Sequence, residues 1–288
     1  MIVSAAMSPI RCLLVPMVVF FSFALISPAS AQNAKVPFPY KGWAVTSGGG
    51  LKIVEVPLNK APKLAPWAPH GQADTALLPS SLPGEQEIGS LIDESLRIVG
   101  DYLPRPYSGA FRLWIFGDVP YAARTEKTDV VLSSRLLKPQ EDQRLPWVLA
   151  HELHHLALIH TGLAAAPSSP QNRILTGLLM EGVATWMCWS SGFFPELDQV
   201  LSDSPDLRES FSRLNAALAG ENPESAGADL YEHNKWGYYA GSWMVRKIHE
   251  RFGKQSWLTL LEQNDEEAGR RLVDLYQRTQ PPPEYSLR

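Results

Sequence analysis

The chain has 288 residues, enough for one or two domains, and 45% of them are hydrophobic, as in an ordinary globular protein. Its 26 lysines and arginines against 30 aspartates and glutamates give a formal net charge of −4 at pH 7. This balance provides no electrostatic attraction to nucleic acid or to an anionic membrane, so neither is expected as a partner.

The first 31 residues have the pattern of a secretory signal peptide. Arg11 precedes an apolar stretch from Leu13 to Ile26, and the letters ASA, ending at Ala31, supply a small-residue cleavage site. The apolar stretch is shorter than the ~20 residues that a membrane-spanning helix needs. We therefore expect cleavage after Ala31, export to the periplasm or the medium, and no stable membrane insertion afterwards. A retained membrane anchor is the alternative.

Residues 32–84 form a proline-rich N-terminal segment. Eight prolines lie between Val36 and Pro83, and because proline removes a helical hydrogen bond, this density excludes long helices. Inside the segment, the letters GWAVTS, GGG and LKIVEVP follow one another. Two strand-like runs around consecutive glycines predict a short hairpin.

Residues 85–277 are expected to form one α+β, mostly helical domain. The letters AFRLWIF and DVVLSS are strand-like, and the pattern from Pro146 to Gln277 is helical with three breaks. The domain therefore consists of helices and a small sheet, and the sheet should pack on the helix that follows it. Residues 278–288 are polar and rich in proline, and we expect a flexible tail.

One predicted helix, with the letters WVLAHELHHLALIHT, contains four of the chain's seven histidines. His151 and His155 are four residues apart, so both rings leave the same face of the helix and can bind one zinc ion. Glu152 lies beside that face and can reach a water on the metal. Zinc lowers the pKa of such a water from ~16 toward ~7, and a carboxylate then takes its proton as the water attacks a carbonyl. A histidine-rich helix without a metal is the alternative.

The other two histidines of this helix do not fit the ligand pattern. His154 is expected to lie behind the ligands or against a neighbouring helix. A metzincin motif would require a glycine and a histidine where the chain has Leu158 and Thr161. We therefore expect His160 at the helix end, facing solvent or a carbonyl.

A catalytic zinc site normally has three protein ligands and one open position. The best third candidate is Glu181 in the letters ILTGLLMEGVATWMCW, because an unpaired carboxylate in such an apolar helix would cost several kcal/mol. Gly182 and Ala184 are small enough to let this helix approach the metal helix closely. The alternative is a buried glutamate satisfied by an arginine or by backbone groups.

The letters HELHH, LMEGVATWM and YYAGSWMVRKIHERFG together resemble the gluzincin zinc metallopeptidases, above all the bacterial zinc proteases with an HExxH…EGxA arrangement. The resemblance spans about residues 110–265 and implies a zincin-like fold. It implies that His151, His155 and Glu181 hold Zn²⁺ and that Glu152 is the general base. It also implies that Tyr238 donates a hydrogen bond to the oxyanion, a contribution of ~3 kcal/mol.

Two points of the resemblance stay open. Tyr239 and His233 are alternative donors to the oxyanion. Thr185 occupies the position where thermolysin-type enzymes have an acid that orients a histidine, so either its hydroxyl or another group must do so. Cys188 is expected to be a small buried residue with no role.

The expected function is that of an exported zinc peptidase acting on a peptide or protein. Residues 129–134 would provide a sheet edge with which an extended peptide could pair. Two alternatives remain: a non-catalytic peptide-binding module with a structural zinc, and a zinc amidase that acts on cell-wall peptides.

Overall fold

The computed structural model describes residues 39–45, 51–53, 85–107, 109–116, 123–126, 129–133, 136, 144–162, 169–192, 197–202, 204–220, 226–227, 229–233, 235–263 and 267–287. The predicted signal peptide, most of the proline-rich segment and the turn of the predicted hairpin lie outside them. Within the described residues, no helix combines the length and the apolar character needed to cross a membrane.

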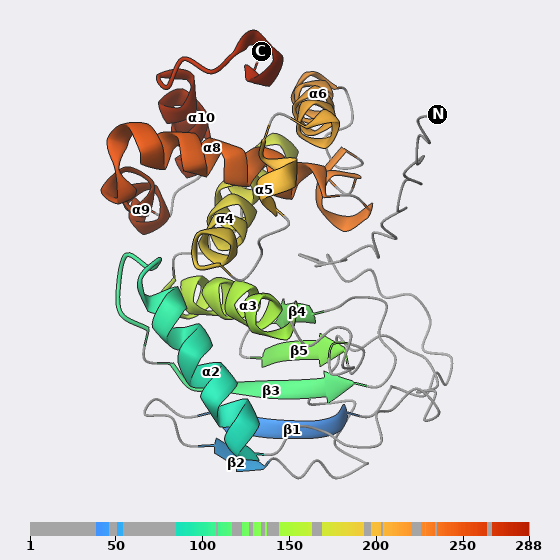
Figure 1. Ribbon diagram of the computed structural model, residues 1–288, viewed down its shortest axis with the longest axis vertical. Helices are drawn as coiled ribbons and strands as arrows, with labels where there is room; N and C mark the ends of the chain where they lie inside the picture. Colours follow the sequence, from blue (N-terminus) through green and yellow to red (C-terminus); the bar gives the residue numbers. More distant parts are fainter. Residues whose placement is uncertain are drawn as a thin grey trace, which may run out of the picture.

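The described strands form one mixed sheet of five, in the order β2-β1-β3-β5-β4 (Figure 1). The strands are β1 Pro39–Val45, β2 Leu51–Ile53, β3 Phe111–Phe116, β4 Ala123–Glu126 and β5 Asp129–Ser133. β1 and β2 are antiparallel, as the predicted hairpin requires. Because β1 also pairs with β3, the hairpin belongs to the same sheet as the later strands, across the boundary expected at residue 84.

The two edges of the described sheet are β2 and β4, so the prediction of an edge strand at residues 129–134 is wrong. β5 lies between β3, to which it is parallel, and β4, to which it is antiparallel, and all its residues are buried. β4 has only four residues, two of them charged. Short, charged strands are typical of sheet edges. Because β4 is short and polar, the pattern of apolar residues in the sequence did not predict it as a strand.

The fold is α+β and mostly helical, as predicted. Figure 1 shows α3 between the sheet and α4, with α8 and α10 beyond α4. The helices are α2 Glu85–Gly100, α3 Leu145–His160, α4 Pro170–Ser190, α5 Leu197–Val200, α6 Pro205–Ala219, α8 Trp236–Phe252, α9 Lys254–Gln263 and α10 Ala268–Gln277. A π-helical turn, η4 Asp229–His233, precedes α8, and a 3₁₀ turn, η5 Pro283–Tyr285, follows α10.

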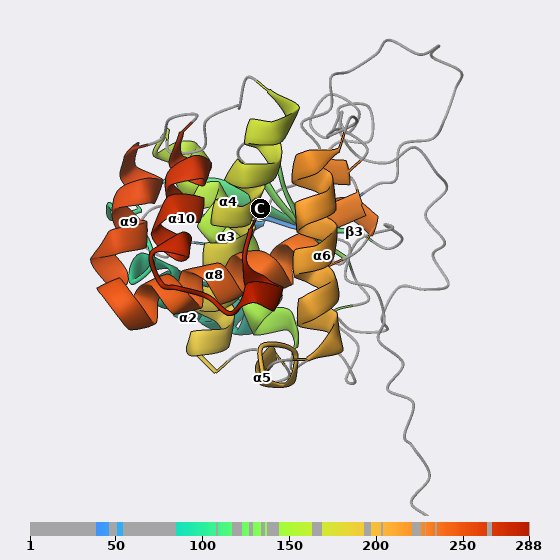
Figure 2. The same ribbon diagram turned by 90° about the horizontal axis from the view of Figure 1, so that it is seen from above.

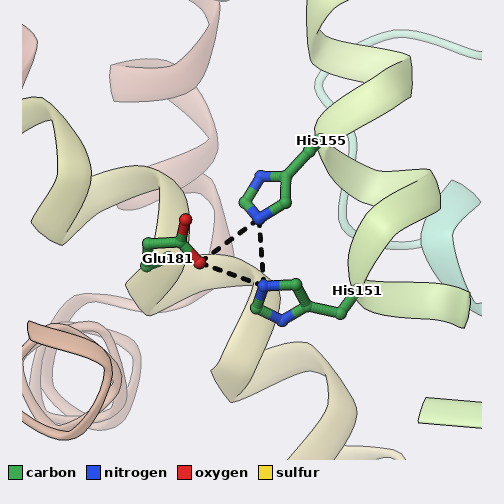
Figure 3. Close-up of side chains that lie close together, drawn as sticks. All are labelled: His151, His155 and Glu181. Atoms are coloured by element: carbon green, nitrogen blue, oxygen red, sulfur yellow. Dashed lines mark hydrogen bonds and ion pairs between the residues drawn. The ribbon is translucent and has the colours of Figure 1, made fainter. Parts of the chain in front are cut away.

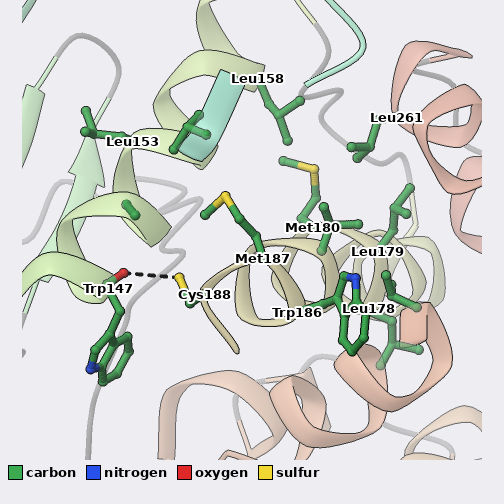
Figure 4. Packing of buried hydrophobic residues seen from close by; sticks show 14 of the residues in the cluster. Trp147, Leu153, Leu158, Leu178, Leu179, Met180, Trp186, Met187, Cys188 and Leu261 are labelled. Carbon is green, nitrogen blue, oxygen red and sulfur yellow. Dashed lines mark hydrogen bonds between the residues drawn. The ribbon is translucent and has the colours of Figure 1, made fainter. Parts of the chain in front are cut away.

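α3 and α4 are central helices whose side chains are buried on nearly every side. In α3, all but one of the residues from Leu145 to Leu158 are buried, and the helix is apolar around its whole circumference. Figure 4 shows the apolar packing between the two helices, with Leu153 of α3 and Met187 of α4 in the cluster. α4 begins where Ser169 accepts a hydrogen bond from the Asn172 amide and Pro170 occupies the first turn. Polar side chains on these two helices are therefore packed tightly and shielded from water.

α4 and α8 touch through their backbones at two glycines. A Cβ on Gly182 would lie 2.6 Å from the carbonyl carbon of Gly241, and a Cβ on Gly241 would lie 2.6 Å from the Leu178 oxygen. Neither position can hold a larger residue without moving a helix. The expectation that Gly182 serves close approach to the metal helix is wrong, because it serves the contact with α8.

The C-terminal residues pack on the domain up to Leu287, so the predicted flexible tail is not found there. Figure 2 shows this segment, in dark red, running from α10 toward α6. Tyr285 is 2% exposed, and its carbonyl accepts a hydrogen bond of 2.9 Å from the Tyr276 hydroxyl. Asn215 of α6 donates to the Ser286 carbonyl at 3.0 Å. An aromatic side chain in an otherwise polar tail therefore completes the core.

Candidate metal centre

Three side chains from two helices converge on one point in the interior (Figure 3). His151 and His155 lie one turn apart on α3, and Glu181 faces them from α4. The Nε2 atoms of the two histidines are 3.0 Å apart, and Glu181 Oε2 lies 3.0 Å from the first and 3.3 Å from the second. All three residues are at most 2% exposed.

This arrangement fits a zinc ion. Zinc–nitrogen and zinc–oxygen bonds of about 2.0–2.2 Å in a tetrahedron require ligand atoms about 3.3 Å apart. The three observed separations are within a few tenths of an ångström of that value. Two imidazoles and one carboxylate are also a common ligand set of catalytic zinc, and a tetrahedron would retain a fourth position.

The neighbouring groups shift the pKa values of Glu181 and His151 in opposite directions. Burial acts to raise the pKa of Glu181, but the two histidines outweigh it and hold this pKa at about 2. Burial acts to lower the pKa of His151, but hydrogen bonds with Cys188 and Glu181 outweigh it and raise this pKa to about 10. A cation is therefore favoured at this point, whether it is a proton or a metal ion.

Glu152 lies beside the three donors and is 1% exposed. The Thr125 hydroxyl of β4 lies 2.7 Å from Glu152 Oε2 and 2.8 Å from the Glu152 carbonyl. The other carboxylate oxygen, Oε1, has no hydrogen-bond partner among the described residues. Burial raises the pKa of Glu152, while His151, His155 and Thr125 oppose the rise. The arrangement leaves one buried oxygen available to accept a proton.

Tyr238 and Tyr239 lie on different sides of α8. The Tyr238 ring is 6.0 Å from the His151 ring and 6.1 Å from the Tyr231 ring, measured between centroids. Burial raises the pKa of Tyr239 to about 12, and Asp206 of α6 contributes to the rise, which places this tyrosine near α6. Of the two, Tyr238 is the one next to His151, a member of the candidate metal centre. The side chain of His233, the third candidate donor, lies outside the described part of the chain.

The two remaining histidines of α3 point away from the three donors. His154 is fully buried, and its Nε2 atom lies 3.3 Å from the Tyr102 carbonyl, just after α2. This position agrees with the expectation that His154 lies against a neighbouring helix. Burial, together with the nearby histidines, lowers the pKa of His154 to about 3. His160 ends α3 as predicted and is partly exposed, and its Nδ1 lies 3.0 Å from the Tyr107 hydroxyl.

Two residues near the site were missed or given no role by sequence reasoning. Thr125 lies in a short polar strand with no motif around it. Cys188 is fully buried, its thiol donates to the Trp147 carbonyl at 3.2 Å, and it acts to raise the pKa of His151. The Thr185 hydroxyl has no hydrogen-bond partner among the described residues. Cys188, one turn further along α4, is therefore the residue of this helix that acts on His151, one of the three candidate metal ligands. Its spacing of seven residues from Glu181 was the available signal.

Comparison with known proteins agrees with this geometry. A family model described as "Putative zinc dependent peptidase (DUF5700)" matches residues 86–278. The match covers well over half of the chain, including every residue of the candidate metal centre. No curated protein and no solved structure matches the chain.

Proposed function

The chain belongs to this family, DUF5700, and we propose that it is an exported zinc peptidase in which Glu152 is the general base. The observation that supports this proposal most directly is the convergence of His151, His155 and Glu181 with a carboxylate beside them. Structural zinc sites are usually closed by four protein ligands and need no base, so three ligands and a neighbouring Glu152 favour catalysis.

A zinc ion held by these three side chains would supply an acidified water and polarise the substrate carbonyl. Glu152 would accept a proton from that water at Oε1 and later deliver it to the leaving amine. Tyr238 would donate a hydrogen bond to the oxygen that becomes negatively charged, since its ring lies next to His151. The apolar surroundings exclude competing water and strengthen each of these interactions.

A peptide or protein substrate is proposed to bind in extended form along β4. The outer side of this strand has no neighbouring strand among the described residues, so its backbone groups can pair with a peptide. β4 also carries Thr125, which contacts Glu152, so a peptide held there would lie near the base. Export is proposed from the signal-like first 31 residues alone.

The test combines metal content with hydrolysis. Mature protein purified with zinc should contain one ion per chain and cleave fluorescein-labelled casein. Glu152→Gln should retain the ion and lose turnover by about 10²–10⁴-fold, because general acid–base catalysis contributes that much. Glu250→Gln, which removes a carboxylate on the exposed side of α8, is the matched control and should change neither quantity.

Each contrary outcome points to a specific alternative. Zinc without cleavage of casein or of cell-wall peptides would indicate a structural zinc in a peptide-binding module. Cleavage of cell-wall peptides but not of casein would indicate an amidase. Turnover of Glu152→Gln near that of the wild type would exclude Glu152 as the base.

A further inference from the structure

Thr125 connects the edge of the sheet to the catalytic carboxylate. Its hydroxyl lies within hydrogen-bonding distance of two oxygens of the same residue, the Glu152 carbonyl at 2.8 Å and Oε2 at 2.7 Å. A hydroxyl has a single proton to donate, so this proton is shared between the two oxygens. The contact spans 27 residues and joins β4 to α3.

We propose that Thr125 is the positioning residue for the general base: it binds Oε2 and thereby directs Oε1 toward the three metal ligands. This inference rests on the proposed function. A glutamate side chain has three rotatable bonds, and no other hydrogen bond to its carboxylate is present among the described residues. Without Thr125, the carboxylate could turn away from the water whose proton it must accept.

The strand holds Thr125 in a fixed place. In the antiparallel ladder Thr125 pairs with Val130, and Ala123 pairs with Leu132. Ala123 and Thr125 are two residues apart, so they lie on the same face of the sheet, and Ala123 on that face is fully buried. Because β5 is buried along its whole length, the β4 backbone is anchored on its inner side.

If Thr125 had a purely structural role, a different result would be expected. Its loss would lower stability and leave turnover per folded, zinc-loaded molecule unchanged. A positioning residue instead changes the rate of the chemical step, because a misplacement of about 1 Å can reduce it by about 10²-fold. Substrate binding and zinc content would change little, since Thr125 contacts none of the three ligands through an observed hydrogen bond.

The experiment compares Thr125→Val, Thr125→Ser and the control Thr185→Val, all zinc-loaded, with fluorescein-labelled casein as the probe. Thr185 is also a buried threonine near the site, but its hydroxyl has no partner among the described residues. Thr125→Val should lose about 10- to 100-fold in kcat with KM within about twofold and one zinc per chain. Thr125→Ser should recover most of the rate, and Thr185→Val should match the wild type.

Two further measurements separate positioning from stability. In the Glu152→Gln background, Thr125→Val should cause no additional loss, because the group that it positions is gone. Crystal structures of the zinc-loaded wild type and Thr125→Val should show the Glu152 carboxylate displaced in the variant. A Thr125→Val enzyme with kcat within twofold of wild type and an unmoved Glu152 would overturn the inference while the peptidase function stands. A zinc-loaded wild type that hydrolyses nothing would overturn both.

Discussion

Replacing Glu181 by glutamine should reveal how much the Glu181 carboxylate contributes to the free energy of unfolding of the metal-free protein. The pKa of Glu181 is held at about 2, against an ordinary value of 4.5, with the two histidines opposing the effect of burial. A difference of about 2.5 units corresponds to about 3 kcal/mol of folding free energy at pH 7. Glutamine has almost the same shape but no charge, so Glu181→Gln should lose about this amount.

The pH dependence follows from the direction of the shift. A carboxyl whose pKa is lowered by folding stabilises the protein above its unfolded pKa, and this stabilisation is lost as the pH falls toward the folded value. The difference between wild type and Glu181→Gln should therefore shrink from about 3 kcal/mol at pH 7 to about 1.4 kcal/mol at pH 3. Glutamine is also a poorer zinc ligand, so the variant should lose its zinc on dialysis against a chelator.

Urea unfolding of the chelator-treated proteins at both pH values measures these quantities. Glu250→Gln serves as the control, because Glu250 pairs with Arg246 and Lys247 at 2.8 Å on the exposed side of α8 and such pairs contribute at most about 1 kcal/mol. A Glu181→Gln difference below about 1 kcal/mol at pH 7, or one that does not change on acidification, would refute the electrostatic reasoning.

Two other predictions concern the packing around the site. Gly241→Ala should destabilise the protein by about 1–3 kcal/mol, because its Cβ would lie 2.6 Å from the Leu178 oxygen; equal urea midpoints would mean that the helices can separate freely. Cys188→Ala should weaken zinc binding about 10-fold in competition with a chromophoric chelator, because it removes the buried thiol that acts on the pKa of His151. An unchanged affinity would show that the thiol does not support this candidate ligand.

The parts of the site that sequence reasoning identified are those whose geometry is local. His151 and His155 share a helix face because of the helical repeat, and that relation needs no knowledge of the tertiary fold. Glu181 was identified because a carboxylate surrounded by apolar residues in one helix requires a partner. The mostly helical α+β class followed in the same way from the spacing of apolar residues.

The missed features depend on contacts between distant segments. Nothing around Thr125 indicates that its strand lies at the sheet edge or that its hydroxyl reaches Glu152. The C-terminal segment was expected to be flexible because its composition is polar, yet buried Tyr285 and hydrogen bonds from Asn215 and Gln277 attach it to the domain. Gly182 does allow a close helix contact, as expected from its small size. Its partner is α8 rather than α3, and this depends on how the three helices stack.

The glycine contact between α4 and α8 also determines which parts of the site can move independently. Glu181 is next to Gly182, and Tyr238 lies one turn before Gly241, so both side chains are attached at the point where the two backbones touch. The close backbone contact favours movement of the two helices together. A movement of these two helices relative to α3 would therefore separate Glu181 from His151 and His155 and break up the candidate metal centre.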